Sequence, residues 1–152
     1  MAKASAGILL YRYEGDELQV LIVHPGGPFW KNKDVGAWSI PKGEFLPGQD
    51  PLTVAKREFH EELGKRVSGK FAELRPIRQA GGKIVYCFVQ ERDVDITSIE
   101  SNTFTTEWPP KSGRQQEFPE VDRAEWVDLD TARQKLNPSQ AAFIDQLEEL
   151  LS

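Results

Sequence analysis

The sequence predicts an α/β fold built as one domain. Three observations predict it: β-rich runs occur at the start, in the middle and near the end of the chain; a helix with clear start and stop signals lies between them; and two helical stretches follow the last β-rich run. The chain has 152 residues and 39% hydrophobic content, which is enough for one core, and no stretch has the composition of a linker. Residues 1–152 are therefore expected to form a single domain.

The expected strands are rich in β-branched and aromatic residues and are bounded by turn signals. They cover residues 4–13, 18–24, 72–79, 83–91 and 125–127, with a short extended piece at 37–40. Glu14-Gly15-Asp16 joins the first two strands and Gly81-Gly82 the third and fourth, so each pair is expected to form a hairpin. Residues 25–36 are rich in Gly, Pro and Lys and are expected to form a loop.

The central helix is expected over residues 51–63. Asp50 is a residue type that caps helices, Pro51 fits the first helical position, and Gly64 is a typical helix stop. Two C-terminal helices, separated by an Asn-Pro pair, are expected at residues 130–136 and 139–151.

Composition and charge exclude several classes of protein. No apolar run is long enough to span a bilayer and the N-terminus lacks the organisation of a signal peptide, so a cytoplasmic protein without membrane contact is expected. The net charge of −5 disfavours an extended nucleic-acid surface, although a small nucleotide with its own cation can still enter an acidic pocket. The single cysteine, Cys87, lies in an apolar run and is expected in the core, so redox chemistry is not indicated.

Three carboxylates of the central helix are predicted to lie on one stripe. Glu58, Glu61 and Glu62 are related as i, i+3 and i+4, whereas the apolar residues of the same helix fall on a separate stripe. Stacked like charges cost roughly 0.2–0.5 kcal/mol per pair on a bare helix, which indicates a missing cation. Because Mg²⁺ prefers oxygen ligands and commonly combines carboxylates with substrate phosphates, the stripe predicts a divalent-metal site.

The spacing around this stripe resembles the signature of the Nudix hydrolase family. That signature runs Gly, five residues, Glu, seven residues, Arg-Glu, an apolar residue, any residue, Glu-Glu, any residue, Gly and an apolar residue. The matching positions, within a box over residues 43–65, are Gly43, Arg57, Glu58, Phe59, Glu61, Glu62 and Gly64. Two positions depart from it, because Gln49 replaces the first Glu and Lys65 the closing apolar residue. Gln49 keeps an oxygen ligand but loses a negative charge, which weakens any metal role at that position.

The resemblance implies a fold, a cofactor and residue roles. The fold would be the Nudix α/β/α sandwich, with a mixed central β-sheet between the box helix and the C-terminal helix. The carboxylates of the acidic stripe, with a backbone carbonyl near Lys42 or Gly43, would hold Mg²⁺ or Mn²⁺. Arg57 would pair with these carboxylates and fix their orientation, and Glu58 or a further acid would act as the base.

Nudix enzymes usually recruit one more acid from outside the box, and this chain offers Glu117, Glu120 and Glu125. Glu120 is the expected one, because its segment EVDRAEWVDLDTA resembles the Glu…Trp-x-x-Leu…Ala stretch of diadenosine tetraphosphate hydrolases. This resemblance makes dinucleoside polyphosphates the leading substrate class.

Substrate contacts are expected from charged and aromatic side chains near the box. Lys42 and Lys83 are candidates for neutralising phosphates, and Trp38 and Tyr86 for binding the rest of the nucleotide. The stretch 97–120 is long for an unstructured connection and is expected to cover the substrate as a loop.

Three functions compete. The first is a Mg²⁺-dependent hydrolase of dinucleoside polyphosphates. The second keeps this chemistry and changes the substrate to a (d)NTP, a nucleotide sugar such as ADP-ribose, or a capped RNA end. The third is a non-catalytic nucleotide sensor, favoured only by Gln49. In each case the partner is a small phosphorylated nucleotide, bound by a monomer or a homodimer.

Overall fold

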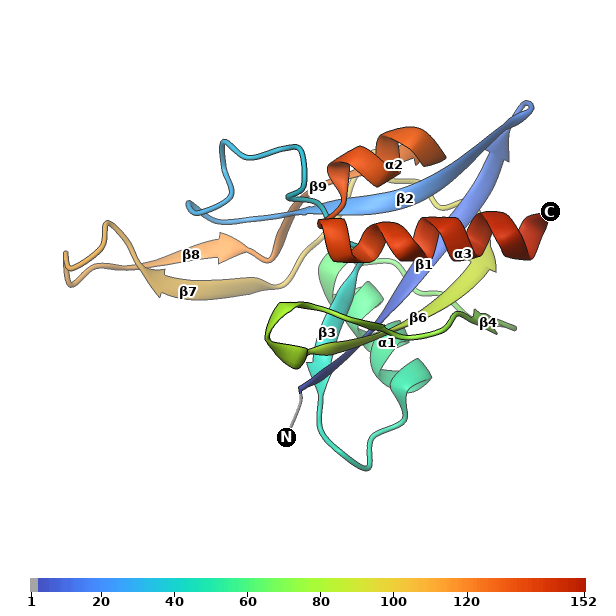
Figure 1. Ribbon diagram of the computed structural model, residues 1–152. Coiled ribbons are helices and arrows are strands. Elements are labelled where there is room, and N and C mark those ends of the chain that lie inside the picture. Colours follow the sequence, from blue (N-terminus) through green and yellow to red (C-terminus); the bar gives the residue numbers. More distant parts are fainter. Residues whose placement is uncertain (1–2) are drawn as a thin grey trace.

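A long strand, β1 (Ala4–Glu14), organises the sheet in the computed structural model, which describes residues 3–152 (Figure 1). Along one edge β1 pairs in parallel with β6 (Ile84–Glu91). Along the other edge it pairs antiparallel with β3 (Lys42–Phe45) near its start and with β2 (Glu17–Pro25) near its end. The seven-stranded sheet is completed by β9 (Val121–Asp128) beside β2, and by β4 (Ala72–Glu73) and β5 (Ile77–Arg78) beside β6. The expected mixed sheet is thereby confirmed.

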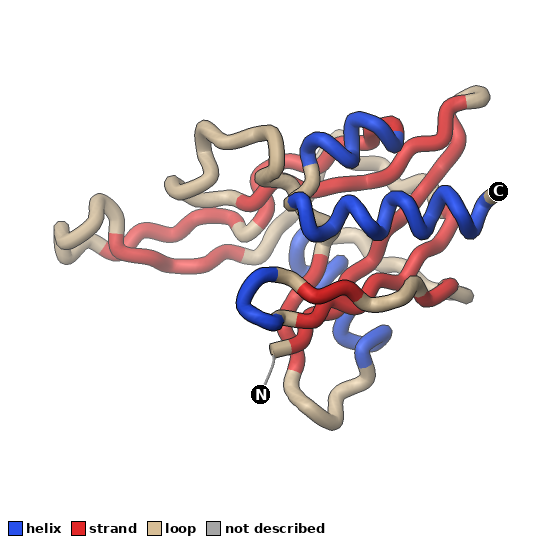
Figure 2. The backbone as a smooth tube through the Cα atoms, viewed as in Figure 1, coloured by secondary structure: helices blue, strands red, loops and turns tan. Residues whose placement is uncertain are grey.

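Helices cover both faces of this sheet, as Figures 1 and 2 show. On one face lies α1 (Pro51–Leu63), and on the other lie α2 (Leu129–Lys135) and α3 (Ala141–Leu151). Because successive side chains of a strand point to opposite faces, Ile8 packs with Phe59 beneath α1, whereas Leu9 packs with Phe143 beneath α3. The expected α/β/α sandwich is confirmed. Two 3₁₀ turns, Ala80–Gly82 and Pro138–Gln140, complete the regular structure.

The box helix has the bounds that its end signals predict. The Asp50 carboxylate accepts hydrogen bonds from the backbone N–H and the hydroxyl of Thr53, at 3.0 and 2.8 Å. Gly64 ends the helix in the left-handed conformation, with φ of 72°. Cys87 is fully buried, as expected. Among the described residues no helix combines the length and the apolar character needed to cross a bilayer.

Several expected boundaries were wrong, in each case because pairing depends on distant residues. Residues 97–120, which were expected to form a loop over the substrate, contain a hairpin of β7 (Thr103–Glu107) and β8 (Gln115–Pro119). The strand expected over 72–79 is split into β4 and β5, and the piece expected at 37–40 forms only single bridges, Val23 with Ser39 and Trp38 with Leu136. β3 was not anticipated, and β9 begins four residues earlier than the expected start at residue 125.

Candidate active site

The box helix turns its carboxylates toward β3. Glu62 is only 8% exposed, and its Oε2 accepts a hydrogen bond from the backbone N–H of Lys42 at 3.0 Å. The next residue along β3, Gly43, lies so close to Glu58 that a Cβ at this position would overlap the Glu58 carboxylate. A side chain at position 43 would therefore push Glu58 away from the strand, which explains why glycine fits here.

Arg57 lies beside two carboxylates of the same helix. Its Nη2 is 3.6 Å from Oε1 of Glu58, and its Nε is 3.9 Å from Oε1 of Glu61. Arg57 is itself half-exposed, so each pair contributes little to stability by itself. The family resemblance implied that Arg57 would lie beside these carboxylates, and the structure places it there.

The carboxyl groups of this region are held in an unfavourable environment. Burial, and then the charges of Glu58 and Glu120, raise the pKa of Glu62 to about 9. Burial and the charge of Glu61 likewise raise the pKa of Glu58, although Arg57 partly offsets the shift. Since like charges raise one another's pKa only at short range, these acids share one electrostatic site.

Glu120 joins this site from the turn between β8 and β9. Its backbone N–H donates to the carbonyl of Asn102 at 2.8 Å, and its carbonyl accepts from Gly26 at 2.9 Å, so both neighbouring loops fix its position. Burial, and then the charge of Glu61, raise the pKa of its carboxyl group. The two other acids lie elsewhere, since Glu117 is exposed on β8 and Glu125 is 3.5 Å from the Lys135 ammonium.

A hollow of about 260 Å³ lies next to these acids and is lined by Lys42, Glu62, Glu120 and Trp30, among others. Burial lowers the pKa of Lys42, and the charge of Lys83 lowers it further, whereas the neighbouring carboxylates raise it. Lys83 directly precedes β6, and its Nζ is 3.7 Å from Oε1 of Glu44 on β3. The structure thus brings both lysines to one end of the sheet, with Lys42 in the hollow.

The two aromatic residues expected to bind substrate lie in different surroundings. Trp38 borders the same hollow, but its side chain is 0% exposed and its Nε1 donates to Asp34 at 2.6 Å. The expectation that Trp38 binds the nucleotide is therefore corrected, because a ring without exposed surface forms a wall and leaves no free face for a base. Tyr86 lies against Phe45, with 5.9 Å between ring centroids, beside a separate hollow of about 530 Å³.

One residue of the site, Gln140, was missed in the sequence. Gln140 is 1% exposed, and its side chain accepts from the Ile40 N–H at 2.9 Å and donates to the Ser39 hydroxyl at 3.1 Å. It lies three residues before Phe143, on the apolar stripe of the helix expected over residues 139–151, so a polar residue at a core position was the available signal. Trp30, one of the aromatic residues that could stack on a base, borders the hollow and is 39% exposed.

The donor atoms of the site suit a hard divalent cation. Within residues 3–152 no three His, Cys, Asp or Glu side chains are already converged in the manner of a filled metal site. The acids nevertheless offer only oxygen ligands, and Glu62 and Glu58 have raised pKa values because of burial and neighbouring carboxylates. A divalent cation among them would relieve this repulsion, so the residues fit Mg²⁺ or Mn²⁺.

Gln49 does not point its amide toward these acids. Its side-chain Oε1 accepts a hydrogen bond from the backbone N–H of Leu46 at 2.8 Å, and its backbone N–H donates to the Leu46 carbonyl at 3.1 Å. The side chain that replaces the first Glu of the signature therefore closes the loop before the helix.

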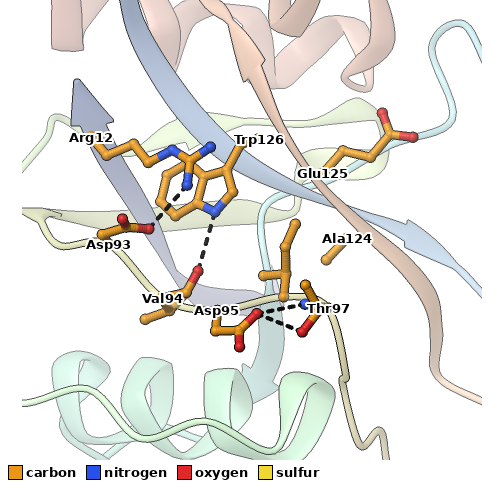
Figure 3. A pocket seen from close by; sticks show the side chains of 9 residues that line it. Arg12, Asp93, Val94, Asp95, Thr97, Ala124, Glu125 and Trp126 are labelled. Atoms are coloured by element: carbon orange, nitrogen blue, oxygen red, sulfur yellow. Dashed lines mark hydrogen bonds and ion pairs between the residues drawn. The ribbon is translucent and has the colours of Figure 1, made fainter. Parts of the chain in front are cut away.

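A larger hollow, of about 710 Å³, lies away from the acidic stripe (Figure 3). The Arg12 guanidinium lies over the Trp126 ring at 4.4 Å and is also 3.0 Å from Asp93. Asp95 accepts two hydrogen bonds from Thr97, which hold the pKa of its carboxyl group below the usual range. This hollow is larger than the one beside Glu62, but its charged groups Arg12 and Asp95 already have partners within the protein.

Comparison with known sequences supports the assignment of the box. The sequence profile described as NUDIX domain matches residues 1–147. Nudix hydrolase 7 of Arabidopsis thaliana is 31% identical over 100 residues, covering 60% of this chain and 34% of that protein. An RNA pyrophosphohydrolase of Bartonella clarridgeiae is 26% identical over 144 residues, covering 82% of this chain and 75% of the relative. The chain thus spans about a third of the length of the plant relative, and most of the bacterial one.

Solved structures with the same architecture cover the whole chain. An Ap4A hydrolase of C. elegans in a binary complex has a TM-score of 0.68 at 18% identity, covering 99% of this chain and 98% of that one. The NUDIX domain of Shewanella oneidensis NrtR, complexed with ADP ribose, has a TM-score of 0.69 at 18% identity, covering 100% and 90%. At these identities the likeness shows the fold.

Proposed function

The chain belongs to the NUDIX family, and from this premise we propose that it is a divalent-metal-dependent hydrolase of phosphoanhydride bonds in nucleoside diphosphate-linked substrates. The observation that carries the proposal is the buried Glu62, whose pKa is raised to about 9 at the edge of a hollow that also contains Lys42. A stability-driven sequence would not bury an acid beside other acids, so the cluster is best explained by a cation and a phosphorylated ligand.

Glu58, Glu61 and Glu62, with a backbone carbonyl at Gly43, are the proposed ligands of Mg²⁺, which when bound would supply positive charge to the phosphate oxygens. Arg57 would orient Glu58 and Glu61 through the contacts described above. Its planar guanidinium can hold two carboxylates at once, which a lysine would do less rigidly.

Glu120 or Glu58 is proposed to accept the proton of the attacking water on a carboxylate oxygen. The raised pKa of each brings it nearer to neutral pH, where a general base combines the deprotonated state with sufficient basicity. Lys42 would contact a phosphate oxygen in the hollow, and Lys83 would act from its rim. Tyr86, beside the separate hollow, is a proposed contact only for a substrate that extends past β3.

Dinucleoside polyphosphates such as diadenosine tetraphosphate are the leading substrates. The support is the segment from Glu120 to Ala132, which resembles the corresponding stretch of diadenosine tetraphosphate hydrolases, together with the shared fold of the C. elegans Ap4A hydrolase. A polyphosphorylated RNA end is the second candidate, because the relative that matches 82% of this chain is named an RNA pyrophosphohydrolase.

The proposal is tested by incubating the protein with diadenosine tetraphosphate, ATP, dGTP, ADP-ribose and a 5′-triphosphorylated RNA, with Mg²⁺, with Mn²⁺ and with EDTA. Products are separated by chromatography. Metal-dependent cleavage of diadenosine tetraphosphate to ATP and AMP is expected. A different preferred substrate would retain the chemistry and change the specificity, whereas nucleotide binding without turnover would overturn the hydrolase and favour a sensor.

The role of Glu120 is tested with Glu120→Gln against Glu117→Gln as a matched control. Both residues are acids of the β8 region, but only Glu120 is linked electrostatically to the box acids. We expect Glu120→Gln to lower kcat by about 10²-fold and Glu117→Gln to leave it unchanged. Equal activity of the two variants would remove Glu120 from the mechanism.

A further inference from the structure

Two segments far apart in the sequence form one projection beside the hollow. We define the arm as the loop over residues 26–37 together with the β7–β8 hairpin, residues 103–119, which extend side by side from the body of the molecule (Figure 1). Phe29 of the loop packs edge-to-face on Trp108 of the hairpin, with 5.4 Å between ring centroids. A Cβ on Gly27 would meet the Phe104 ring at 2.7 Å, so the two segments are in close contact.

The arm is anchored to the sheet by a buried histidine. His24 on β2 is fully buried, with Nδ1 2.8 Å from Oδ1 of Asp122 and Nε2 2.7 Å from the carbonyl oxygen of Lys33. Lys33 belongs to the loop and Asp122 to β9, so the imidazole connects three segments. The loop is therefore held in position beside the hollow by a contact inside the protein.

The loop exposes an unusual share of apolar surface. Of the six large hydrophobic side chains exposed among the described residues, three belong to it: Phe29 at 57%, Trp30 at 39% and Val35 at 76%. Trp30 borders the hollow that contains Lys42 and Glu62, whereas Phe29 lies farther out against the hairpin. Exposed aromatic groups clustered in this way are typical of a binding surface.

The same arm carries positive charge in an acidic protein. Lys31 and Lys33 of the loop, and Lys111 and Arg114 of the hairpin, are exposed, and none of the four forms an ion pair within residues 3–152. The Lys33 ammonium lies 5.2 Å from the centroid of the Trp30 ring, so charge and aromatic surface adjoin one another. The arm also contains Asp34, Glu107 and Glu117, so its net charge is +1, compared with −5 for the whole chain.

We propose that the arm binds the single-stranded RNA that follows a 5′-polyphosphate held in the hollow. Aromatic rings that stack on bases, next to lysines and arginines that contact phosphates, form the common surface for single-stranded nucleic acids. Trp30 would stack on the first base outside the hollow, and Phe29 with Trp108 would contact a base farther along the chain. The inference rests on the proposed function and concerns its second candidate substrate, the polyphosphorylated RNA end.

The arm is tested with an eight-nucleotide RNA carrying either a 5′-triphosphate or a 5′-hydroxyl. Fluorescence anisotropy measures the affinity of each RNA for the protein at several salt concentrations. All proteins in this binding assay carry Glu62→Gln, so that the RNA is not hydrolysed. The arm variant replaces Lys31, Lys111 and Arg114 by Ala, and the matched control replaces Arg66, Lys70 and Arg78, which are also exposed and form no ion pair within the described residues. Circular dichroism checks that both remain folded.

We expect the arm variant to bind both RNAs at least tenfold more weakly, with a smaller salt dependence, and the control variant to bind within about twofold of the parent. Without the Glu62→Gln background, the arm variant should hydrolyse diadenosine tetraphosphate at the parental rate. Phe29→Ala should weaken RNA binding about tenfold through lost stacking.

Equal RNA affinity of the arm and control variants would overturn the proposal, even if the protein hydrolyses nucleotides normally. A dimer that depends on the arm residues, with unchanged RNA affinity, would overturn it in favour of self-association. Absence of turnover on every substrate would defeat the proposed function. Weaker binding of the arm variant to the 5′-hydroxyl RNA, which has no 5′-triphosphate, would still support the arm.

Discussion

The hollow beside Glu62 encloses about 260 Å³ and the hollow beside Trp126 about 710 Å³. In the smaller one, Glu62 and Lys42 both have pKa values displaced toward the neutral form by burial. In the larger one, Arg12 is paired with Asp93 and stacked on Trp126, and Asp95 is held by Thr97 (Figure 3).

The two hollows differ in whether their charged groups already have partners, which their volumes do not reveal. Charges that already have partners stabilise the fold and leave little to gain from a ligand. Charges that are buried near others of the same sign cost free energy until a counter-charge arrives. Only the smaller hollow is in that condition, and it is the one beside the box helix.

The largest expected effect is the loss of turnover in Glu62→Gln. Removing this proposed metal ligand should reduce kcat by more than roughly 100-fold, because losing a residue that only supports a metal ligand already costs roughly 10–100-fold. The fold should persist, because the substitution removes a buried acid from among other acids. Steady-state kinetics and circular dichroism measure both effects. A fully active variant would show that the smaller hollow is not the metal site.

Gly43→Ala should have the next largest effect. The new Cβ would overlap the Glu58 carboxylate, so Glu58 must move and the site must open. Because the clash is with the outer part of a flexible side chain that can rotate aside, we expect a small change in the free energy of unfolding and a higher Mg²⁺ concentration for half-maximal activity. Glu44→Ala, on the exposed side of the same strand, is the control. If Gly43→Ala and the parent need the same Mg²⁺ concentration for half-maximal activity, Gly43 does not contribute to the metal site.

Glu62 should also make the metal-free protein less stable as the pH rises. Its pKa is about 9 in the folded chain and 4.5 as an isolated group, so the folded state binds more protons between these values. Stability is therefore greatest below pH 4.5 for this group and falls as the pH increases to 9. Burial and the charges of Glu58 and Glu120 raise this pKa, whereas the backbone N–H and the ammonium of Lys42 partly offset the rise.

Urea unfolding in EDTA at pH 5, 7 and 9 measures this dependence. Glu62→Gln should be about as stable as the parent at pH 5 and more stable at pH 9, by roughly 2 kcal/mol or more. Glu73→Gln, an exposed acid on β4, should follow the parent at each pH. Parallel curves for the parent and Glu62→Gln would show that this acid ionises normally.

The smallest effect is expected in the larger hollow. Arg12→Ala removes a cation–π contact and an ion pair with Asp93, so we expect a loss of about 1 kcal/mol in stability and a kcat within about twofold of the parent. Thermal unfolding and the same kinetic assay test both expectations. A tenfold fall in kcat would mean that the chemistry involves the larger hollow.

Predictions from sequence succeeded for features that depend on neighbouring residues. The bounds of α1 follow from Asp50, Pro51 and Gly64, because each acts on the backbone next to it. The stripe of three glutamates follows from the period of the helix. The first strand was expected over residues 4–13 and β1 spans Ala4–Glu14, since its β-rich composition and the turn that follows are local.

Predictions failed where a residue's surroundings come from a distant segment. Trp38 was expected to bind substrate, but its ring is enclosed by the core that contains Phe143 and Leu136. The β7–β8 hairpin was expected to be a loop, because its strands pair only with each other and are mostly exposed, without an alternating apolar pattern.

The sequence by itself determined the α/β class, the box helix and the charge of its stripe, since capping and periodicity are local properties of the backbone. Glu120 was expected only from the family resemblance. The fold of the whole chain brings it near the box acids, Gln140 to the hollow and Phe29 to Trp108. Those approaches depend on how β9 registers against β2 and how the last helix packs, which are cooperative outcomes of the whole core.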